Sequence, residues 1–499
     1  MRIKSKYPLR VISRSSFFSE EERSNIHVIG ASRQGKSFFL EWLMRGDIDR
    51  ELGCCLLDPS AGGATAYRLL AYCAQKKKKK VLFIDTEDYY QTRKVTGLNP
   101  FIYKEGHPTA KLKDISVRTL MGAVRDLYSV KDPAEQSRIE RYLPKVFEAL
   151  YDARRPLTDA KIFTNRLYRR EQDEILSHTS SDVRTDIREA LSPGISYVNF
   201  QSTVNRLLRF TGGTIGKMFS SLGGVDWMKV IREDWVVIVR LDNLDTFDAR
   251  LLGTYIAAQL QSAKDRLNKA IDRHREFSKR GEYPPFYLYA DEAYLFASES
   301  LKNVLDLKQK MNFKVTLAHH YAKQFSPDFY ESIKVNTGMT VQFYIRGRET
   351  RDNISEEMYG GDINPKDASY ANANIPKQYA VIKIGKGAPQ RERVPDVPTP
   401  RISKENYDRY IIKMYQHLTE LGWYTEPVTS NYEPERSDTN NSRSRAEDDS
   451  PTNGKTPRPR GTASSQKWQT VPEELPGRKQ PAKKDDEAKP TTPKGKSKS

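Results

Sequence analysis

Short apolar runs recur along this sequence and predict the strands of one buried sheet. Turn residues bound the runs, and several of the longer segments between them carry apolar residues at the helical spacing of three and four. Because strands that alternate with helices form parallel sheets, the pattern predicts an α/β fold whose ligands bind at the carboxyl ends of the strands. The predicted strands span residues 26–29, 52–58, 81–85, 235–241, 286–290, 313–318, 339–345 and 379–384.

A long stretch of the sequence follows helical periods throughout. Apolar residues recur at threes and fours along residues 139–150 and again along residues 162–176. We therefore predict an all-helical insertion at residues 111–210, which divides the sheet domain into residues 25–110 and 211–424. The insertion also carries basic side chains that either contact a substrate or form the solvated face of a helix, namely Lys161, Arg166, Arg169 and Arg170.

The two ends of the sequence differ in composition from the predicted sheet domain. Residues 1–24 form a short basic arm. Beyond residue 424 the sequence is rich in Pro, Ser, Thr, Asn and charged residues, and Trp468 is almost alone among large apolar side chains. Such a segment cannot bury enough apolar surface to offset the entropy that ordering costs. We therefore predict that residues 425–499 are a disordered tail.

The loop after the first predicted strand matches the phosphate-binding pattern G-x-x-x-x-G-K-S. A strand before it and a helix after it are the context that this P-loop requires. The glycines let successive backbone N–H groups surround phosphate oxygens, and the helix adds its positive N-terminal end. Lys36 would reach the β- and γ-phosphates, and Ser37 would hold Mg²⁺. The predicted nucleotide-binding residues are Gly30, Ala31, Ser32, Arg33, Gln34, Gly35, Lys36, Ser37 and Phe38.

Two later strands end in polar residues that suit the chemistry of a P-loop. The run at residues 286–290 leads into Asp291 and Glu292, an acidic pair of the Walker B kind. Asp291 would orient Mg²⁺, usually through its water, and Glu292 would polarise the attacking water. The run at residues 313–318 ends at His319 and His320, and His320 would lie beside the γ-phosphate and sense hydrolysis. A histidine at a strand end is more often structural, so its position carries this prediction.

The charge of the chain indicates a polyanionic partner. Its formal net charge is +18, and residues 431–499 contain 15 Lys and Arg against 11 Asp and Glu, so +14 remains on the other residues. Nucleic acid is the usual partner of such a protein, an anionic membrane surface is the second, and a merely soluble basic surface is the third. Five consecutive lysines at residues 76–80 form either a solvated turn or a nucleic-acid contact.

The cysteines and the hydropathy indicate a cytoplasmic protein. The cysteines have no metal-ligand spacing and cannot form a disulfide framework, which fits a reducing compartment; they are Cys54, Cys55 and Cys73. No apolar run approaches the length of a membrane span. We therefore expect a cytoplasmic protein, or one attached at the inner face of the membrane through a partner.

The order of these motifs resembles the HerA/FtsK superfamily of hexameric pumping ATPases, especially the conjugative type IV secretion coupling proteins. The resemblance covers roughly residues 25–395 and includes His27-Val28-Ile29-Gly30, Leu57-Asp58-Pro59, Asp85 with Leu98-Asn99-Pro100, the helical insertion and Tyr289-Ala290-Asp291-Glu292. It implies a RecA-like sheet that carries an all-α domain, and a homo-hexameric ring that uses ATP and Mg²⁺ to move DNA, or protein in some branches. It also implies the roles given above for Lys36, Ser37, Asp291 and Glu292.

Three positions depart from the pattern of that superfamily. Asp58-Pro59-Ser60-Ala61 stands where members usually have Asp-Pro-His-Gly, and His320 replaces the usual Gln. Members commonly have Arg-Lys before that Gln, and the arginine acts across a subunit joint, whereas this chain has Gln309-Lys310. Lys310 is therefore the first candidate for the trans-acting cation, with Arg346 and Arg348 as alternatives. We also expect this protein to lack the N-terminal membrane anchor of many coupling proteins.

The sequence thus predicts a ring-forming ATPase that translocates DNA in the conjugative transfer of a mobile element. Membrane-bound secretion or transfer machinery is a further expected partner. One alternative within motors is viral genome packaging or the energising of protein secretion. An alternative from another class is a nucleotide-binding scaffold that assembles a complex without turnover.

Overall fold

The computed structural model describes residues 10–11, 23–103, 109–128, 132–272, 285–307, 312–359 and 374–428. Most of the predicted basic arm and nearly all of the predicted tail lie outside these described residues. Within them, ten strands form one sheet, and β5 (Val95–Thr96) pairs with β12 (Tyr424–Thr425) in a second, small sheet.

The large sheet is parallel over most of its width. Its order is β1-β11-β10-β9-β2-β8-β7-β3-β6-β4, and all neighbours from β9 to β4 run parallel, whereas β10 is antiparallel to both β9 and β11. The strands are β1 (Arg10–Val11), β2 (Ile26–Ile29), β3 (Cys54–Asp58), β4 (Val81–Ile84), β6 (Val236–Arg240), β7 (Phe286–Ala290), β8 (Phe313–His319), β9 (Met339–Gln342), β10 (Tyr379–Ile384) and β11 (Gln390–Arg393).

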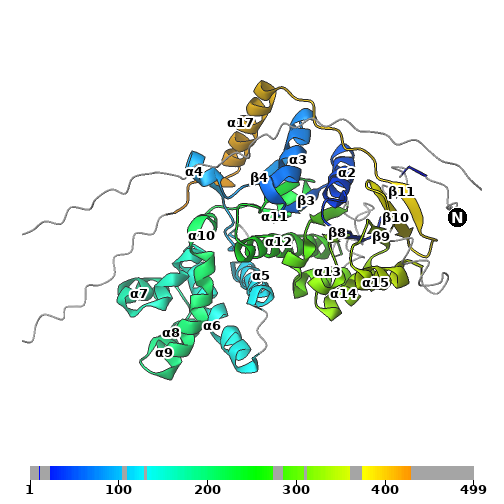
Figure 1. Ribbon diagram of the computed structural model, residues 1–499. Coiled ribbons are helices and arrows are strands. Elements are labelled where there is room, and N and C mark those ends of the chain that lie inside the picture. The colour runs from blue at the N-terminus through cyan, green and yellow to red at the C-terminus, as the bar shows by residue number, and fades with distance from the viewer. Residues whose placement is uncertain are drawn as a thin grey trace, which may run out of the picture. The chain divides into compact units, whose positions relative to one another are not determined.

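Helices cover both faces of the parallel part, which explains why its strands read as continuous apolar runs. Figure 1 shows α2 (Lys36–Asp49), α3 (Ala64–Gln75) and α17 (Lys404–Glu420) on one side. On the other side lie α12 (Thr246–Asp272), α13 (Glu299–Leu307) and α14 (Pro327–Asn336). The chain first runs from β2 towards β4 and then returns to β9, so right-handed crossovers place the later helices on the opposite face.

The predicted helical insertion is confirmed. Between β5 and β6 the described chain is helical, with α5 (Thr109–Tyr128), α6 (Pro133–Asp152), α7 (Arg169–Ser177), α8 (Ser181–Leu191), α9 (Ile195–Val204), α10 (Gly213–Phe219) and α11 (Trp227–Arg232). Asp132 caps α6 by accepting a hydrogen bond from the backbone N–H of Ala134, and Pro133 occupies the first helical position, where its missing N–H costs nothing. The periodic residues Leu143, Phe147 and Leu150 are fully buried.

The strand order determines which loops meet. Strands β2, β8 and β7 are neighbours although they are far apart in sequence, and all three run in the same direction. The loops after their carboxyl ends therefore meet at one edge of the sheet, as the parallel pattern predicts. No helix among the described residues has the length and apolar character needed to cross a membrane.

Candidate nucleotide-binding site

The glycine loop that follows β2 allows close approach of the backbone. A Cβ atom added to Gly30 would lie 2.5 Å from Cβ of Phe343, so only glycine fits there. Gly35 immediately precedes α2. Its φ of +112° is a backbone conformation that residues with side chains rarely adopt. The loop therefore brings backbone N–H groups and the N-terminus of α2 to a single place.

Lys36 lies under this loop and is largely buried. Its Nζ is 3.0 Å from the Gly30 carbonyl oxygen, 3.3 Å from that of Ala31 and 3.0 Å from Nδ1 of His320. Burial lowers the pKa of Lys36, and the charges of Asp291 and Glu292 oppose that shift. A partly desolvated ammonium of this kind gains most from a nearby phosphate, because little water screens the attraction.

Asp291 and Glu292 follow β7 beside the first turn of α2. The Ser37 hydroxyl donates to Oδ2 of Asp291 at 2.6 Å, and the Glu292 N–H donates to Oδ1 at 3.1 Å. The pKa of Asp291 is raised because the carboxylate is buried, and the hydrogen bond from Ser37 only partly opposes this shift. Glu292 has a left-handed backbone, φ 49° and ψ 50°, and within the described part of the chain its buried Oε2 has no hydrogen-bond partner. That oxygen remains able to accept a proton or orient a water.

His320 joins these groups at the end of β8. Its Nε2 lies 2.7 Å from Oε1 of Glu292, and its Nδ1 lies 3.1 Å from the Gly30 carbonyl oxygen as well as 3.0 Å from Nζ of Lys36. The hydrogen bond to Glu292 raises the pKa of His320, while burial and the charge of Lys36 oppose the shift. The structure thus brings together five of the predicted site residues, namely Lys36, Ser37, Asp291, Glu292 and His320.

A cavity of about 770 Å³ opens over the glycine loop. Besides the predicted residues, it is lined by a segment from the other end of the sheet domain, which sequence reasoning did not find. These additional lining residues include Phe343, Lys377, Gln378, Val394, Pro395, Asp396 and Val397. Nothing in the sequence marks that segment as part of a site, because the sheet topology alone brings it to the loop.

The residues around the loop fit a nucleoside triphosphate with Mg²⁺. A hydroxyl and a carboxylate oxygen, those of Ser37 and Asp291, already lie side by side next to the amine of Lys36. Among the described residues, no group of three or more His, Cys, Asp or Glu forms a metal site. Mg²⁺ in phosphate sites needs few protein ligands, because phosphates and water supply the rest.

Two of the three candidates for a cation acting across a subunit joint lie among the described residues. Lys310 lies outside the described residues. Arg346 lines a smaller hollow of about 300 Å³ beside Ala31, Ser32 and His320. The Arg348 side chain is 87% exposed and lies 3.7 Å from Asp352, at the start of α15 (Arg348–Tyr359). Arg346 is therefore near the loop of its own subunit, and Arg348 is directed into solvent.

A buried polar network lies behind the site, on the face of the sheet covered by α14. Nε2 of His319 lies 2.7 Å from Nε2 of His27, whose Nδ1 lies 3.1 Å from Oε1 of Glu357. Nδ1 of His319 faces the Tyr321 carbonyl oxygen, which can only accept, so His319 donates there and accepts from His27. Nδ1 of His27 donates to the carboxylate of Glu357, which accepts.

The pKa shifts agree with this arrangement of protons. Burial lowers the pKa of His319 well below its usual value, and the charge of His27 lowers it further. Burial alone would raise the pKa of Glu357, but the charge and hydrogen bond of His27 outweigh it and lower that pKa. The network links β2, β8 and α15, so it fixes the strand end from which His320 projects.

The strand ends of β3 and β6 carry further polar contacts. Asp58 accepts hydrogen bonds from the backbone N–H groups of Ser60, at 3.0 Å, and Ala66, at 2.8 Å, and burial raises its pKa to about 6. Arg240 forms ion pairs with three carboxylates, those of Asp85, Glu87 and Asp242. The substitution of Ser60-Ala61 for the usual His-Gly thus leaves Asp58 capping the start of α3.

The lysine run at residues 76–80 forms a turn at the surface. Lys76 pairs with Asp49 at 2.8 Å, and Lys80 lies 3.7 Å from Glu233. Two of the five lysines are thus engaged with carboxylates of the same chain, which favours the solvated turn over a nucleic-acid contact.

The fold and the glycine loop are those of the P-loop NTPase class, and solved structures match the fold. The unbound conjugative coupling protein TrwBdeltaN70 matches with a TM-score of 0.51 and 14% identity, over 81% of this chain and 92% of that one. Plasmid coupling protein TrwB in complex with ADP and Mg²⁺ matches with a TM-score of 0.50 and 13% identity, over 80% and 90%. VirB4 of Thermoanaerobacter pseudethanolicus gives a TM-score of 0.49 and 12% identity, over 79% and 98%.

The two TrwB structures confirm the expected similarity at the level of the fold. No family model matches the sequence, and a search of curated proteins finds no significant match. The chain therefore has the fold of a conjugative coupling protein, a mostly parallel sheet with an inserted helical domain.

Proposed function

We propose that this protein is a ring-forming ATPase that translocates DNA. The observation that carries the proposal is the meeting of Lys36, Ser37, Asp291, Glu292 and His320 at the ends of three neighbouring strands. Two solved structures of the coupling protein TrwB share the fold, and one of them is described in complex with ADP and Mg²⁺. Conjugative transfer is accordingly the process that we propose.

In this proposal each side chain has one task. Lys36 would turn from the carbonyl groups of its own loop to the β- and γ-phosphates of ATP. Ser37 and Asp291 would hold Mg²⁺, whose charge would offset that of the phosphates. Glu292 accepts a proton from the attacking water through its unpartnered Oε2. His320 contacts both Lys36 and Glu292, so it is placed to report whether the γ-phosphate is present.

DNA is the proposed substrate because the residues outside 431–499 carry a strongly positive net charge, +14. Phosphate contacts release counterions, so binding should weaken steeply between about 50 and 200 mM salt. A homo-hexameric ring would place a cation of the neighbouring subunit beside the γ-phosphate, and Lys310, Arg346 and Arg348 remain the candidates. We also propose the division into sheet domain, helical insertion at residues 111–210 and tail, and a cytoplasmic location or attachment to membrane machinery through a partner.

Steady-state ATP hydrolysis with and without DNA tests the proposal. A DNA-translocating ATPase shows turnover that rises when DNA is added. Tight ATP binding without any turnover would favour the scaffold, because a scaffold needs the nucleotide only for assembly. Turnover that is insensitive to DNA but rises with a protein substrate would favour the energising of secretion.

A further inference from the structure

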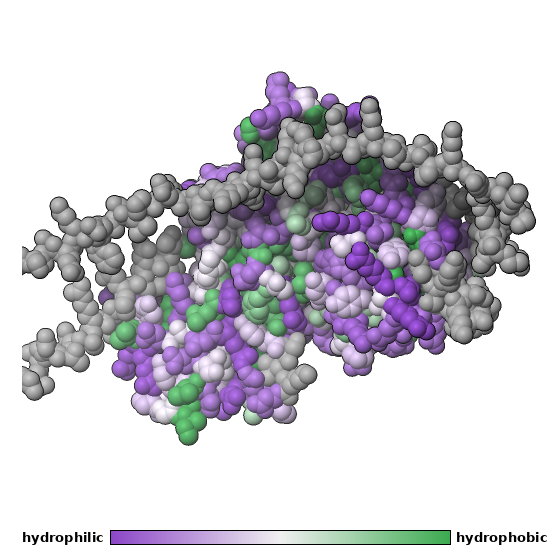
Figure 2. All heavy atoms as spheres, in the orientation of Figure 1, coloured by the Kyte–Doolittle hydropathy of each residue, from purple (hydrophilic) through white to green (hydrophobic). Residues whose placement is uncertain are grey.

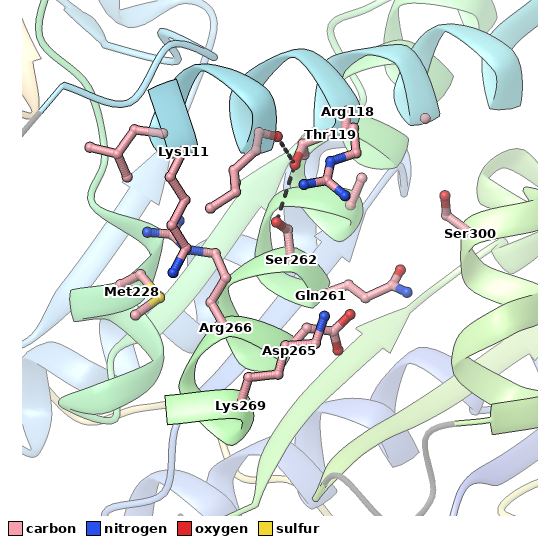
Figure 3. Close-up of a pocket in the computed structure, with 14 residues that line it drawn as sticks. Lys111, Arg118, Thr119, Met228, Gln261, Ser262, Asp265, Arg266, Lys269 and Ser300 are labelled. Carbon is pink, nitrogen blue, oxygen red and sulfur yellow. Dashed lines mark hydrogen bonds between the residues drawn. The ribbon is translucent and has the colours of Figure 1, made fainter. Parts of the chain in front are cut away.

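A second concave site lies away from the nucleotide cavity, between α5 of the helical insertion and α12 of the sheet domain. Its volume is about 670 Å³, and α11 and α13 contribute to its rim. Figure 3 shows Arg118 and Thr119 of α5 facing Gln261 and Ser262 of α12 across it. The hydroxyl groups of Thr119 and Ser262 lie 3.1 Å apart and join the two helices at its floor.

The charge of this cleft is predominantly positive. Lys111 and Arg118 project from α5, and Arg266 and Lys269 from α12, while Asp265 is the one acidic residue in its lining. Lys111 and Arg118 are two helical turns apart, so their Cα atoms are separated by about 10 Å along the axis. Cations that are spaced along two facing helices suit an anion with repeating charges better than a single phosphate.

Most of these cations are not compensated within the protein. Arg118 pairs with Asp114 on the exposed side of α5. In the described part of the chain, however, no ion pair or hydrogen bond engages Lys111, Arg266 or Lys269. Burial lowers the pKa of Arg266, and the charge of Asp226 only partly opposes the shift. Among the described residues, no carboxylate lies within ion-pair distance of this half-buried guanidinium, so an anion in the cleft would stabilise it.

The remaining lining suits a nucleic-acid strand. Leu112, Ile115 and Met228 give it an apolar wall, and Gln261 and Ser262 offer hydrogen-bonding groups. A strand can set its phosphates against the cations and its sugars against the apolar wall. An acidic protein segment would match the cations but would leave these other groups without a specific role.

The cleft is also connected to the nucleotide site. Helix α12 precedes β7, and Ser300, on the opposite side of the cleft, lies on α13 just after the acidic pair. Between them, Gly253 of α12 packs so closely on Phe296 that an added Cβ would lie 2.3 Å from the ring. A ligand that moves α12 relative to α13 would therefore displace the turn that carries Glu292.

We propose that the cleft between α5 and α12 binds the phosphodiester backbone of a DNA strand and transmits its presence to Glu292. The inference rests on the proposed function and extends it by naming where DNA contacts each subunit. DNA stimulation of ATP hydrolysis should therefore depend on Arg266 and Lys269.

Charge removal tests this assignment against a matched control. Arg266→Gln/Lys269→Gln should weaken binding of a single-stranded oligonucleotide at least tenfold at about 100 mM salt and abolish stimulation, with DNA-free hydrolysis within twofold of wild type. The slope of log Kd against log salt concentration should be smaller in the double variant than in wild type by about 1.4. Lys404→Gln/Lys413→Gln removes the same charge from exposed positions on α17 and should leave binding unchanged.

The outcomes separate the two proposals. If both double variants bind DNA as tightly as wild type, the cleft is not the DNA-binding site. The proposed DNA-translocating function would be unaffected by that result. If wild type does not bind DNA at low salt, both the proposed DNA translocation and the proposed DNA site in the cleft are wrong. Polyglutamate should compete with bound DNA less well than an unlabelled oligonucleotide does. Equal competition would contradict a DNA site in the cleft, because it would indicate that the cleft recognises any polyanion.

Cross-linking provides a test that removes no charge. The three native cysteines, Cys54, Cys55 and Cys73, are buried, so a surface cysteine can be labelled selectively. Gln261→Cys carrying a photoreactive group should cross-link to a bound oligonucleotide, and Lys413→Cys carrying the same group should not. Equal yields at the two positions would contradict the assignment.

Discussion

The contact between His320 and Glu292 should make ATP hydrolysis depend on pH in a defined direction. Nε2 of His320 lies 2.7 Å from Oε1 of Glu292, and that hydrogen bond raises the pKa of His320 above its usual 6.5. Below this pKa the imidazolium pairs with the carboxylate and restrains it. As the pH rises through it, the imidazole becomes neutral, and Glu292 is more readily available to a water.

The size of the effect follows from the exposure of the pair. Both side chains are 25% exposed, so solvent screens the attraction, and a pair of this kind contributes about 0.5–1 kcal/mol. The rate constant kcat/KM for ATP, which reports the free enzyme, should therefore rise by about two- to fivefold across the transition. His320→Gln keeps a hydrogen-bonding side chain but cannot become charged, so it should lack this step.

Stability provides a second measurement with the opposite sign. Because the folded-state pKa of His320 is raised, its pairing stabilises the protein fully below pH 6.5 and ceases to do so as the pH rises through the raised pKa. The thermal midpoint of wild type should exceed that of His320→Gln at about pH 5.5, and the difference should shrink at about pH 8.5. Identical pH profiles of kcat/KM in wild type and His320→Gln would refute this account.

Three further predictions concern other side chains. Lys36→Ala should lower ATP affinity or abolish turnover, because it removes the charge over the β- and γ-phosphates; wild-type turnover, measured as phosphate release, would contradict the site. Glu357→Gln should lower the free energy of unfolding by about 1–3 kcal/mol in urea titrations, because it removes the carboxylate that accepts a hydrogen bond from His27 in a buried network; an unchanged midpoint would show that this contact contributes nothing. Lys310→Ala should lower kcat with little change in ATP affinity, and mixed rings with Glu292→Gln should regain activity; mixed rings that assemble yet stay inactive would move the role to Arg346 or Arg348.

Features encoded in contiguous sequence could be predicted. The strands of the parallel sheet read as apolar runs because both of their faces are buried, and the glycine loop has a fixed pattern between a strand and a helix. The acidic pair at Asp291 and Glu292 was identifiable because it ends a strand downstream of that loop. The period of two along a strand also separates His319, which is buried, from His320, which faces the site.

Features that depend on tertiary contacts could not be predicted. His27 and Glu357 meet only because β2 lies between β8 and β9, and no local pattern encodes that order. The same holds for Lys377 and Val397 in the wall of the nucleotide cavity. A cation that acts across a subunit joint is a further case, because its position depends on a neighbouring chain.

The central claim is that the loop, the acidic pair and His320 form a site that hydrolyses ATP. Its most direct test compares ATP turnover and ATP affinity in wild type and Glu292→Gln, in the presence of Mg²⁺ and single-stranded DNA. The account predicts that wild type turns over ATP faster with DNA, and that Glu292→Gln binds ATP with wild-type affinity but no longer hydrolyses it. Undiminished hydrolysis by Glu292→Gln, or loss of ATP binding while the variant stays folded, would contradict it.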